Sequence, residues 1–310
     1  MTSLHEISTA LKAIARDEKI KSRILDNPGL YQLLLKAALR FIGGETLAQC
    51  IPVVHALNKR GFLTTIDFMG ENTRSSELAN QATEEFLKII ETIKTEKLPS
   101  SISLDLSHIG LAASDKLALS NATVISMAAR DAGLEMMISM EGSEKTDQIL
   151  SLYNRLSTKF DNVGITIQAN LFRTDRDFQS ILQQKGKIRL VKGAFLESEA
   201  AARPKGNLVD CAYQEFAEVL IRKGHRCSMA THDNALINRV LSFIEKNHLD
   251  FDPLEFEMLY SVNFETLERM KKLGFPVRVY VPYGKEWYLY FCHRLAEHPP
   301  NLYQALLDIL

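Results

Sequence analysis

The sequence predicts a (β/α)8 barrel of the α/β class, with extra helices at its N-terminus. Eight short apolar or β-branched runs, each of strand length, alternate with longer amphipathic stretches of helical length. Most of these runs are apolar on both faces, which is typical of parallel strands covered by helices. The eight units occupy about 240 residues, the usual size of a closed barrel of this kind.

The first 60 residues differ from the rest, because they read as helices with no strand before the first apolar run. We expect this segment, 1–60, to cap the barrel or to pack on its side, and the barrel itself to occupy 61–310. No long linker or low-complexity stretch separates the two parts, so nothing marks the segment as an independent domain.

The predicted strands follow one another in a regular order. They are TTIDFM (64–69), SISLDLS (101–107), EMMISME (135–141), VGITIQA (163–169), KIRLVKG (187–193), CSMATHD (227–233), LEFEMLY (254–260) and VRVYVPYG (277–284). A doubly wound open sheet is the competing architecture. The first strand is not followed by the GxGxxG pattern of dinucleotide-binding sheets, and eight regular units favour closure into a barrel.

Two of the helical stretches between the strands carry end signals. The stretch 74–94 begins in a serine-rich region that suits an N-cap. The stretch 210–224 ends on Gly224 after Arg222 and Lys223, and a glycine that follows basic residues is a common C-terminal signal.

The composition is that of a soluble globular protein. The 310 residues are 46% hydrophobic and 24% charged, and the formal net charge of −1 argues against a nucleic-acid partner. Four cysteines without CxxC spacing indicate reduced thiols rather than a disulfide frame or a zinc site. Neither a signal peptide nor an apolar run of about 20 residues is present. We therefore expect a cytoplasmic protein, and peripheral contact with a membrane stays open.

In a (β/α)8 barrel the active site forms at the C-terminal ends of the strands. Several predicted strands end in polar side chains after an otherwise apolar run, which is a poor choice for packing alone. These residues are Asp67, Asp105, Ser139, Glu141, Gln168, Lys192, Thr231, His232, Asp233, Tyr260 and Tyr280. The fifth strand ends in Lys192-Gly193, a pair that suits a phosphate or the edge of a flavin.

These residues favour a large cofactor over a metal or a protein nucleophile. His232 and Asp233 could each ligate a metal, but neighbouring residues on a strand point to opposite faces. The sequence contains no HxH, HExxH or GxSxG pattern, and no cysteine lies beside an evident base. A core histidine with satisfied hydrogen bonds is the simpler explanation for His232 taken alone. The whole polar set is better interpreted as a cradle for a cofactor that carries the chemistry.

Ordered motifs along the chain resemble the monofunctional bacterial proline dehydrogenases. The motifs are GGETL, DFMGE, RLVKGAFLE, ATHD, FEMLY, VRVYVPYGKEWYLYF and RLAEHPPN, and they run from about Gly43 to Asn301. The resemblance implies a distorted (β/α)8 barrel that binds FAD non-covalently. It also implies hydride transfer to flavin N5 from the carbon next to the ring nitrogen of proline, with electrons then passed to a quinone at the membrane surface.

The residues that the family uses to bind the cofactor are all matched in this sequence. It implies that Arg189 lies near flavin N5 and that Lys192 with Gly193 lines the cofactor. Gln168 matches a residue that bonds the isoalloxazine, whereas Thr231 and its neighbour match positions along the ribityl and phosphate part. The implied cofactor-binding residues are Gln168, Arg189, Val191, Lys192, Gly193, Ala194, Thr231 and His232.

The substrate side departs from the family pattern. The family binds the proline carboxylate with a lysine on strand two and two consecutive arginines in a YxxRRxxE pattern on the last helix. In this chain the lysine position holds Asp105 and the first arginine is His293, while Tyr290, Arg294 and Glu297 remain.

Other pocket positions also differ. Strand three ends in Ser139 where the family usually has an aspartate, and Phe195 stands where a tyrosine follows the KGA motif. Leu259 and Tyr280, which would shape the pocket for the ring, remain, and the resemblance implies catalytic roles for Arg189 and Tyr280.

The two altered cation positions bear on the substrate. The family has a cation at each of three positions, and this chain has Asp105, His293 and Arg294 there. Relative to the family, the charge of the site therefore falls by at least two units if His293 is neutral. A like charge beside a carboxylate raises its energy. We therefore expect a better fit for an amine whose carboxyl is amidated, esterified or absent, or that carries a second ammonium. Alternatively, Asp105 pairs with Arg294 or His293 and the pocket still tolerates a carboxylate.

The leading hypothesis is therefore an FAD-dependent dehydrogenase that oxidises L-proline to 1-pyrroline-5-carboxylate, or oxidises a proline-like amine. Its implied partners are a small amine or amino acid and a quinone acceptor. One alternative is a flavin-binding relative that is catalytically silent or regulatory. The other is an unrelated metal-dependent barrel hydrolase, although we expect no catalytic metal.

Overall fold

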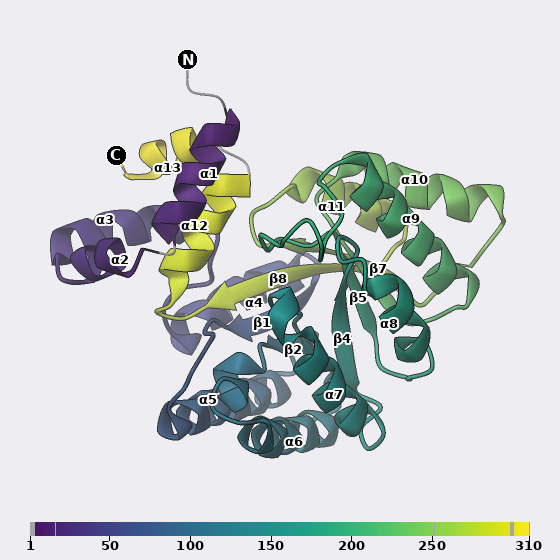
Figure 1. The fold of residues 1–310 in the computed structure, drawn as a ribbon, viewed down its shortest axis with the longest axis horizontal. Coiled ribbons are helices and arrows are strands. Elements are labelled where there is room, and N and C mark those ends of the chain that lie inside the picture. Colours follow the sequence, from purple (N-terminus) through teal and green to yellow (C-terminus); the bar gives the residue numbers. More distant parts are fainter. Residues whose placement is uncertain (1–3, 16, 251, 298–300, 310) are drawn as a thin grey trace.

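Eight parallel strands close into a barrel, and helices surround it (Figure 1). This computed structural model describes residues 4–15, 17–250, 252–297 and 301–309. Each strand pairs with the next one along the chain, and β8 pairs with β1, so the predicted (β/α)8 fold is confirmed. The strands are β1 (Leu63–Phe68), β2 (Ser100–Leu104), β3 (Met136–Ile138), β4 (Val163–Gln168), β5 (Ile188–Val191), β6 (Cys227–Ala230), β7 (Leu254–Leu259) and β8 (Val277–Tyr283).

All eight predicted strands are present, although most end earlier than predicted. β5 ends at Val191 and β6 ends at Ala230, so Lys192 and Thr231 lie in the loops that follow these strands. The prediction overran because the apolar pattern continues into loop residues that are also buried or half-buried. Several polar residues at the ends of the predicted strands are therefore loop residues at the C-terminal end of the barrel, whereas Asp67, Gln168 and Tyr280 lie within β1, β4 and β8.

Two helix ends lie where the sequence signals predicted them. The Ser75 hydroxyl accepts from the Leu78 amide at the start of α5, and α9 ends at Arg222 just before Gly224, whose φ is +58°. The helices are α5 (Ser76–Glu96), α6 (Asp115–Asp131), α7 (Thr146–Ser157), α8 (Thr174–Ile181), α9 (Asn207–Arg222), α10 (Asn234–Lys246) and α11 (Phe264–Lys272), with single turns at η1 (Ser107–Leu111) and η2 (Ser143–Lys145).

The N-terminal and C-terminal helices form a lobe beside the barrel (Figure 1). This helical lobe contains α1 (Leu4–Ala15), α2 (Glu18–Leu25), α3 (Pro28–Ala38), α12 (Trp287–Glu297) and α13 (Asn301–Ile309). α1 packs along α12 and α3 packs against α13, around an apolar core that includes Phe41, Trp287 and Phe291. α4 (Leu47–Lys59) instead covers β1 and β8. The division of the chain at residue 60 stays a prediction.

Two backbone hydrogen bonds tie the lobe to the end of β8. The Gly43 amide donates to the Pro282 carbonyl at 2.8 Å, and the Gly284 amide donates to the Gly44 carbonyl at 3.0 Å. α12 begins three residues after Gly284. The path of the chain from β8 into α12 is therefore fixed, which matters because α12 also borders the site described below.

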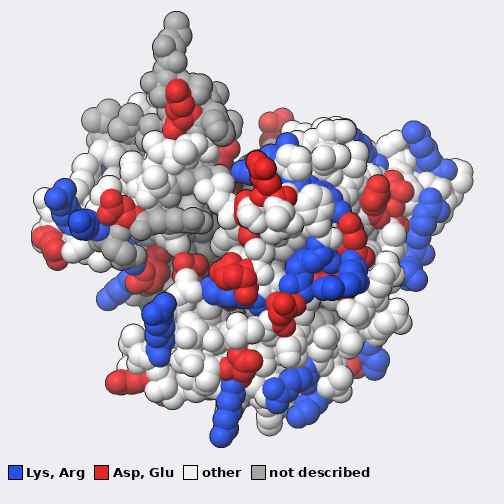
Figure 2. Space-filling model, viewed as in Figure 1, with Lys and Arg blue, Asp and Glu red and all other residues white. Residues whose placement is uncertain are grey.

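The surface carries both signs of charge. Figure 2 shows lysine and arginine side chains interspersed with aspartate and glutamate on the face that it presents. This pattern agrees with the formal net charge of −1. None of the helices in the described part of the chain is both long and apolar enough to cross a membrane.

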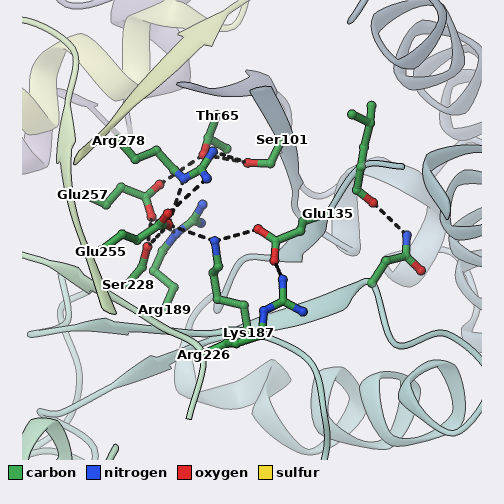
Figure 3. Close-up of polar contacts among 12 residues, drawn as sticks. Thr65, Ser101, Glu135, Lys187, Arg189, Arg226, Ser228, Glu255, Glu257 and Arg278 are labelled. Atoms are coloured by element: carbon green, nitrogen blue, oxygen red, sulfur yellow. Dashed lines mark hydrogen bonds and ion pairs between the residues drawn. The ribbon is translucent and has the colours of Figure 1, made fainter. Parts of the chain in front are cut away.

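The bore of the barrel holds a network of buried ion pairs (Figure 3). Glu255 of β7 accepts hydrogen bonds from Arg278 of β8 at 2.8 and 3.0 Å, and one from Lys187 of β5 at 3.0 Å. Two residues further along β7, Glu257 accepts a hydrogen bond of 3.0 Å from Nε of Arg189. Residues two apart on a strand share a face, so both glutamates point inward.

Ser228 of β6 joins the two halves of this network. Its hydroxyl lies 2.9 Å from Oε2 of Glu257 and 2.5 Å from Oε1 of Glu255. Barrels of this class usually fill their bore with branched apolar side chains. Here charged groups occupy the bore, and each must keep its partner because an unpaired buried charge is strongly destabilising.

The pKa of Glu255 reports the balance of these interactions. Burial raises it, but Arg278 and Lys187 outweigh burial and lower the pKa of Glu255 from 4.5 to about 2. The folded-state pKa lies below the ordinary value, so the ionised carboxylate stabilises the fold fully above pH 4.5. That contribution is lost as the pH falls towards 2.

We expect Glu255→Gln to lower the free energy of unfolding by about 3–5 kcal/mol at pH 7, because two buried cations lose their charge partner. The difference from wild type should shrink between pH 4.5 and pH 2, the range in which wild-type Glu255 takes up its proton. Urea unfolding at pH 7 and pH 3 measures both effects. The exposed Glu265→Gln is the control, and an equal loss of stability in that variant would contradict the prediction.

Candidate active site

A cavity of about 1120 Å³ opens at the C-terminal end of the barrel, between the strand ends and α12. It is larger than the roughly 300–1,000 Å³ of common small-molecule sites, which suits a cofactor together with a substrate. Among the residues predicted for the site, those that line the cavity are Gln168, Arg189, Val191, Lys192, Gly193, Ala194, Thr231, His232, Leu259, Tyr280, Tyr290, His293, Arg294 and Glu297. Asp105 is not among the lining residues.

Arg189 stands at the floor of this cavity and is held from two sides. Nε donates to Glu257, and Nη1 donates to the Ser103 hydroxyl of β2 at 3.0 Å. The guanidinium carbon lies 5.2 Å from the centre of the Tyr280 ring. The side chain is only 5% exposed, yet Nη2 has no hydrogen-bond partner within the described residues. Burial lowers the pKa of Arg189 but Glu257 outweighs it, so this buried cation keeps one N–H for a ligand.

The loop after β5 brings its backbone close to the cavity. Gly193 has a φ of +109°, and a Cβ at this position would lie 1.9 Å from Oδ1 of Asn170. Only glycine fits such a conformation and such a close approach without strain. Lys192 next to it forms ion pairs with Asp210 of α9 at 2.6 Å and with Asp233 at 2.9 Å. The loop is therefore pinned between α9 and the start of α10.

The loop after β6 differs from the expectation for this segment. We predicted that His232 and Asp233 point to opposite faces of a strand, but β6 has already ended at Ala230 and both residues line the cavity. Asp233 caps α10 by accepting from the Ala235 and Leu236 amides. His232 is neutral, because burial and then Arg294 lower its pKa to about 3, and its Nδ1 has no partner within the described residues.

α12 closes the cavity with one polar face. His293 and Arg294 follow Tyr290 by three and four residues and precede Glu297 by four and three, so all four lie on the same side of the helix. Arg294 donates from Nη2 to Oε1 of Glu297 at 2.6 Å, and its guanidinium carbon lies 5.1 Å from the centre of the Tyr290 ring. The opposite face, which includes Trp287, is buried in the helical lobe.

Two aspartates lie beside residues that line the cavity. Asp67, near the end of β1, interacts with Tyr280, and Asp105, just after β2, interacts with Ser139. Both Tyr280 and Ser139 line the cavity. Burial raises the pKa of Asp67 to about 7, although Tyr280 and Arg189 partly oppose the effect. Burial also raises the pKa of Asp105 well above its ordinary value, and the neighbouring Glu141 raises it further.

Sequence comparison identifies the family of this chain. The sequence profile described as proline dehydrogenase matches residues 50–299. Proline dehydrogenase 1 of Bacillus subtilis (strain 168) is 36% identical over 273 residues, which cover 88% of this chain and 90% of that protein. The proline dehydrogenase of Deinococcus radiodurans is 31% identical over 275 residues, with 87% and 89% covered.

The chain belongs to the proline dehydrogenase family.

Solved structures support the fold of this proline dehydrogenase family member. Proline utilization A of Bdellovibrio bacteriovorus, inactivated by N-propargylglycine, superposes with a TM-score of 0.78 over 93% of this chain. The sequences are 19% identical, and the chain spans 38% of that much longer protein, so the likeness concerns the fold alone. Proline dehydrogenases are oxidoreductases that act on a CH–NH donor, and the family is flavin-dependent.

Three residues of the site were missed by sequence reasoning. Glu257 and Ser103 hold Arg189, and Asp210 holds Lys192. Glu257 did leave a signal, because charges two residues apart in an otherwise apolar strand must share the inner face of a barrel. Asp210 gave no such signal in the sequence, because an acidic residue on an amphipathic helix ordinarily faces solvent.

We expect Asp67→Asn to raise the melting temperature, and to raise it more as the pH increases from 4 to 7. The folded-state pKa of about 7 lies above the ordinary 3.8, so ionised Asp67 destabilises the fold increasingly over this range and constantly above it. Asparagine keeps an acceptor for Tyr280 but never ionises. Thermal unfolding across this pH range measures the effect against the exposed Asp131→Asn, and a gain that is independent of pH would refute the assignment.

Proposed function

We propose that this chain is an FAD-dependent dehydrogenase that oxidises the C–N bond of proline or of a proline-like amine. The unpartnered Nη2 of Arg189 carries this proposal, because a buried guanidinium with a spare N–H requires an acceptor in the cavity beside it. Flavin offers such acceptor atoms along one edge of its ring. Family membership supports the reaction type.

The residues present fit FAD. The cavity has room for a dinucleotide and a small substrate, and Gly193, which has no Cβ, lets the backbone approach a large planar group. Gln168, Val191, Lys192, Gly193, Ala194, Thr231 and His232 would hold the cofactor non-covalently. Neutral His232 has an unpartnered Nδ1 that suits a hydroxyl, and Lys192 stays charged because its two carboxylate partners outweigh burial.

When bound, the flavin supplies the hydride acceptor, and the protein supplies position and electrostatics. Arg189 remains charged and is held in place by Glu257 and Ser103, so its Nη2 would donate to an acceptor of the cofactor at the cavity floor. Tyr280 stacks on the guanidinium and, with Leu259, gives the ring of the amine an apolar wall. This arrangement supports the catalytic roles that we propose for Arg189 and Tyr280.

α12 supplies the groups around the remainder of the substrate. Arg294, His293, Tyr290 and Glu297 face the cavity from above the strand ends. For the second half-reaction we propose a quinone at a membrane surface as the electron acceptor of a cytoplasmic enzyme. Oxidation of the reduced protein by quinone in lipid vesicles tests this part separately.

Anaerobic mixing of the purified yellow protein with amines should bleach the oxidised flavin band, because the amine delivers two electrons to the cofactor. Proline, prolinamide, hydroxyproline and pyrrolidine form the test set, and each reaction is followed by absorbance in a stopped-flow instrument. Reduction by dithionite is the control that shows a competent flavin. A protein whose flavin responds to dithionite but to none of these amines is instead a flavin-binding family member without dehydrogenase activity.

Gly193→Ala should lower FAD affinity by roughly tenfold or more, because Cβ strains the backbone and collides with buried Asn170. The matched control is Gly206→Ala, since Gly206 has a φ of +108° but open space around the added carbon. FAD content after gel filtration and the dissociation constant from flavin fluorescence provide the measurement. Equal FAD affinity in the two variants would show that the loop after β5 does not hold the cofactor.

A further inference from the structure

Glu257 places a carboxylate at the floor of the cavity, next to the guanidinium of Arg189 (Figure 3). Both residues line the cavity, although Glu257 is only 3% exposed and Arg189 only 5%. The Oε2 atom of Glu257 lies 3.0 Å from the Nε atom of Arg189. The floor of the cavity is therefore an ion pair whose formal charges sum to zero.

The Glu257 carboxylate is fixed on both of its oxygens. Oε2 also accepts a hydrogen bond from the Ser228 hydroxyl of β6 at 2.9 Å, and Oε1 accepts one from the Thr65 hydroxyl of β1 at 3.4 Å. Each oxygen thus has a partner on another strand. These contacts prevent the carboxylate from turning away from the guanidinium when a ligand enters the cavity.

The same carboxylate determines which N–H groups of Arg189 remain for a ligand. Glu257 accepts from Nε and Ser103 accepts from Nη1, whereas Nη2 has no partner within the described residues. A guanidinium is planar, so two fixed nitrogens also fix the direction of the third. Glu257 is therefore a positioning residue for Arg189.

Glu257 also compensates the charge of Arg189. Burial lowers the pKa of Arg189, and Glu257 provides the largest of the interactions that raise it. Under the proposed function, Nη2 of Arg189 donates to the flavin. A cation beside a flavin favours the reduced form, because that form carries more negative charge, and an adjacent anion opposes this effect.

We infer that Glu257 sets the reduction potential of the bound flavin by neutralising Arg189, which keeps the flavin harder to reduce than it would be beside a lone guanidinium. The inference rests on the proposed FAD-dependent dehydrogenase function and adds an electrostatic role to the residue that holds Arg189. A lower potential makes the transfer of two electrons from the amine less favourable. It makes their later transfer to the electron acceptor more favourable.

Four forms of the holoprotein that differ in charge at the cavity floor test this inference. The pair is neutral in wild type, positive in Glu257→Gln, negative in Arg189→Gln and neutral again in the double variant. Each form is reduced slowly under nitrogen together with a reference dye, which gives the reduction potential of its flavin. We expect the equilibrium constant for reduction to rise roughly tenfold or more in Glu257→Gln and to fall by a similar factor in Arg189→Gln. A tenfold change corresponds to about 30 mV for a two-electron couple.

The double variant separates the charge of the pair from its geometry. It lacks the hydrogen bond between the two side chains, yet the floor of the cavity is again neutral. Because neither partner remains as an unpaired buried charge, this variant also guards against misfolding of the single variants. Its potential should lie between those of the two single variants. A double variant that matches either single variant would show that charge compensation does not set the potential.

Glu255→Gln is the matched control. Glu255 lies two residues before Glu257 on the same face of β7, is 5% exposed, and pairs with Arg278 and Lys187. At about 3.3 Å per residue, its carboxylate lies roughly 6–7 Å further along the bore from the cavity. We expect this variant to lose stability but to keep a potential close to that of wild type. Equal shifts in Glu255→Gln and Glu257→Gln would attribute the effect to general disruption of the bore and overturn the inference.

The failure of this inference is distinguishable from the failure of the proposed function. A wild-type protein that binds no reducible flavin contradicts the function itself. A wild-type flavoprotein whose potential does not change in Glu257→Gln overturns only the role of Glu257.

Discussion

The buried ion pair between Arg189 and Glu257 is the interaction on which the site depends. A guanidinium inside a protein is tolerated only with a charge partner and satisfied hydrogen bonds. Glu257 provides the charge at 3.0 Å, and Ser228 connects that carboxylate to Glu255 and the cations below it. The bore of this barrel is therefore a continuous polar network. This network positions the charged Arg189 at the floor of the cavity. Nη2 of this residue has no hydrogen-bond partner within the described residues.

The helical lobe completes the cavity from the other side. α12 uses its two faces differently: Trp287 and Phe291 pack in the apolar core of the lobe, while Arg294 and its neighbours face the barrel. Because α1 lies along α12, the N-terminal helices support a wall of the site, and Phe41 lines the cavity directly. The adjacent basic residues His293 and Arg294 thus belong to a helix whose position depends on both ends of the chain.

The fold could be predicted from the sequence because apolar strands and amphipathic helices are local patterns. Strand ends were less accurate, since buried loop residues such as Met69 and Ala169 continue the apolar pattern beyond β1 and β4. The pairing inside the bore could not be predicted, because Arg189 and Glu257 are 68 residues apart and only barrel closure brings them together. Most residues selected for the site line one cavity, and their individual roles stay predictions. Asp105 is not among the described residues that line that cavity, whereas Ser139, with which it interacts, is.

The same ion pair bears on the charge of Asp67, which lies next to the lining of the cavity. Arg189 lowers the pKa of Asp67, yet burial outweighs this attraction and leaves the pKa at about 7. A guanidinium whose charge is already compensated by Glu257 attracts a second carboxyl less strongly than a free cation would. Asp67 therefore keeps its proton more readily, so the ion pair that holds the arginine also bears on the protonation of a carboxyl beside the cavity.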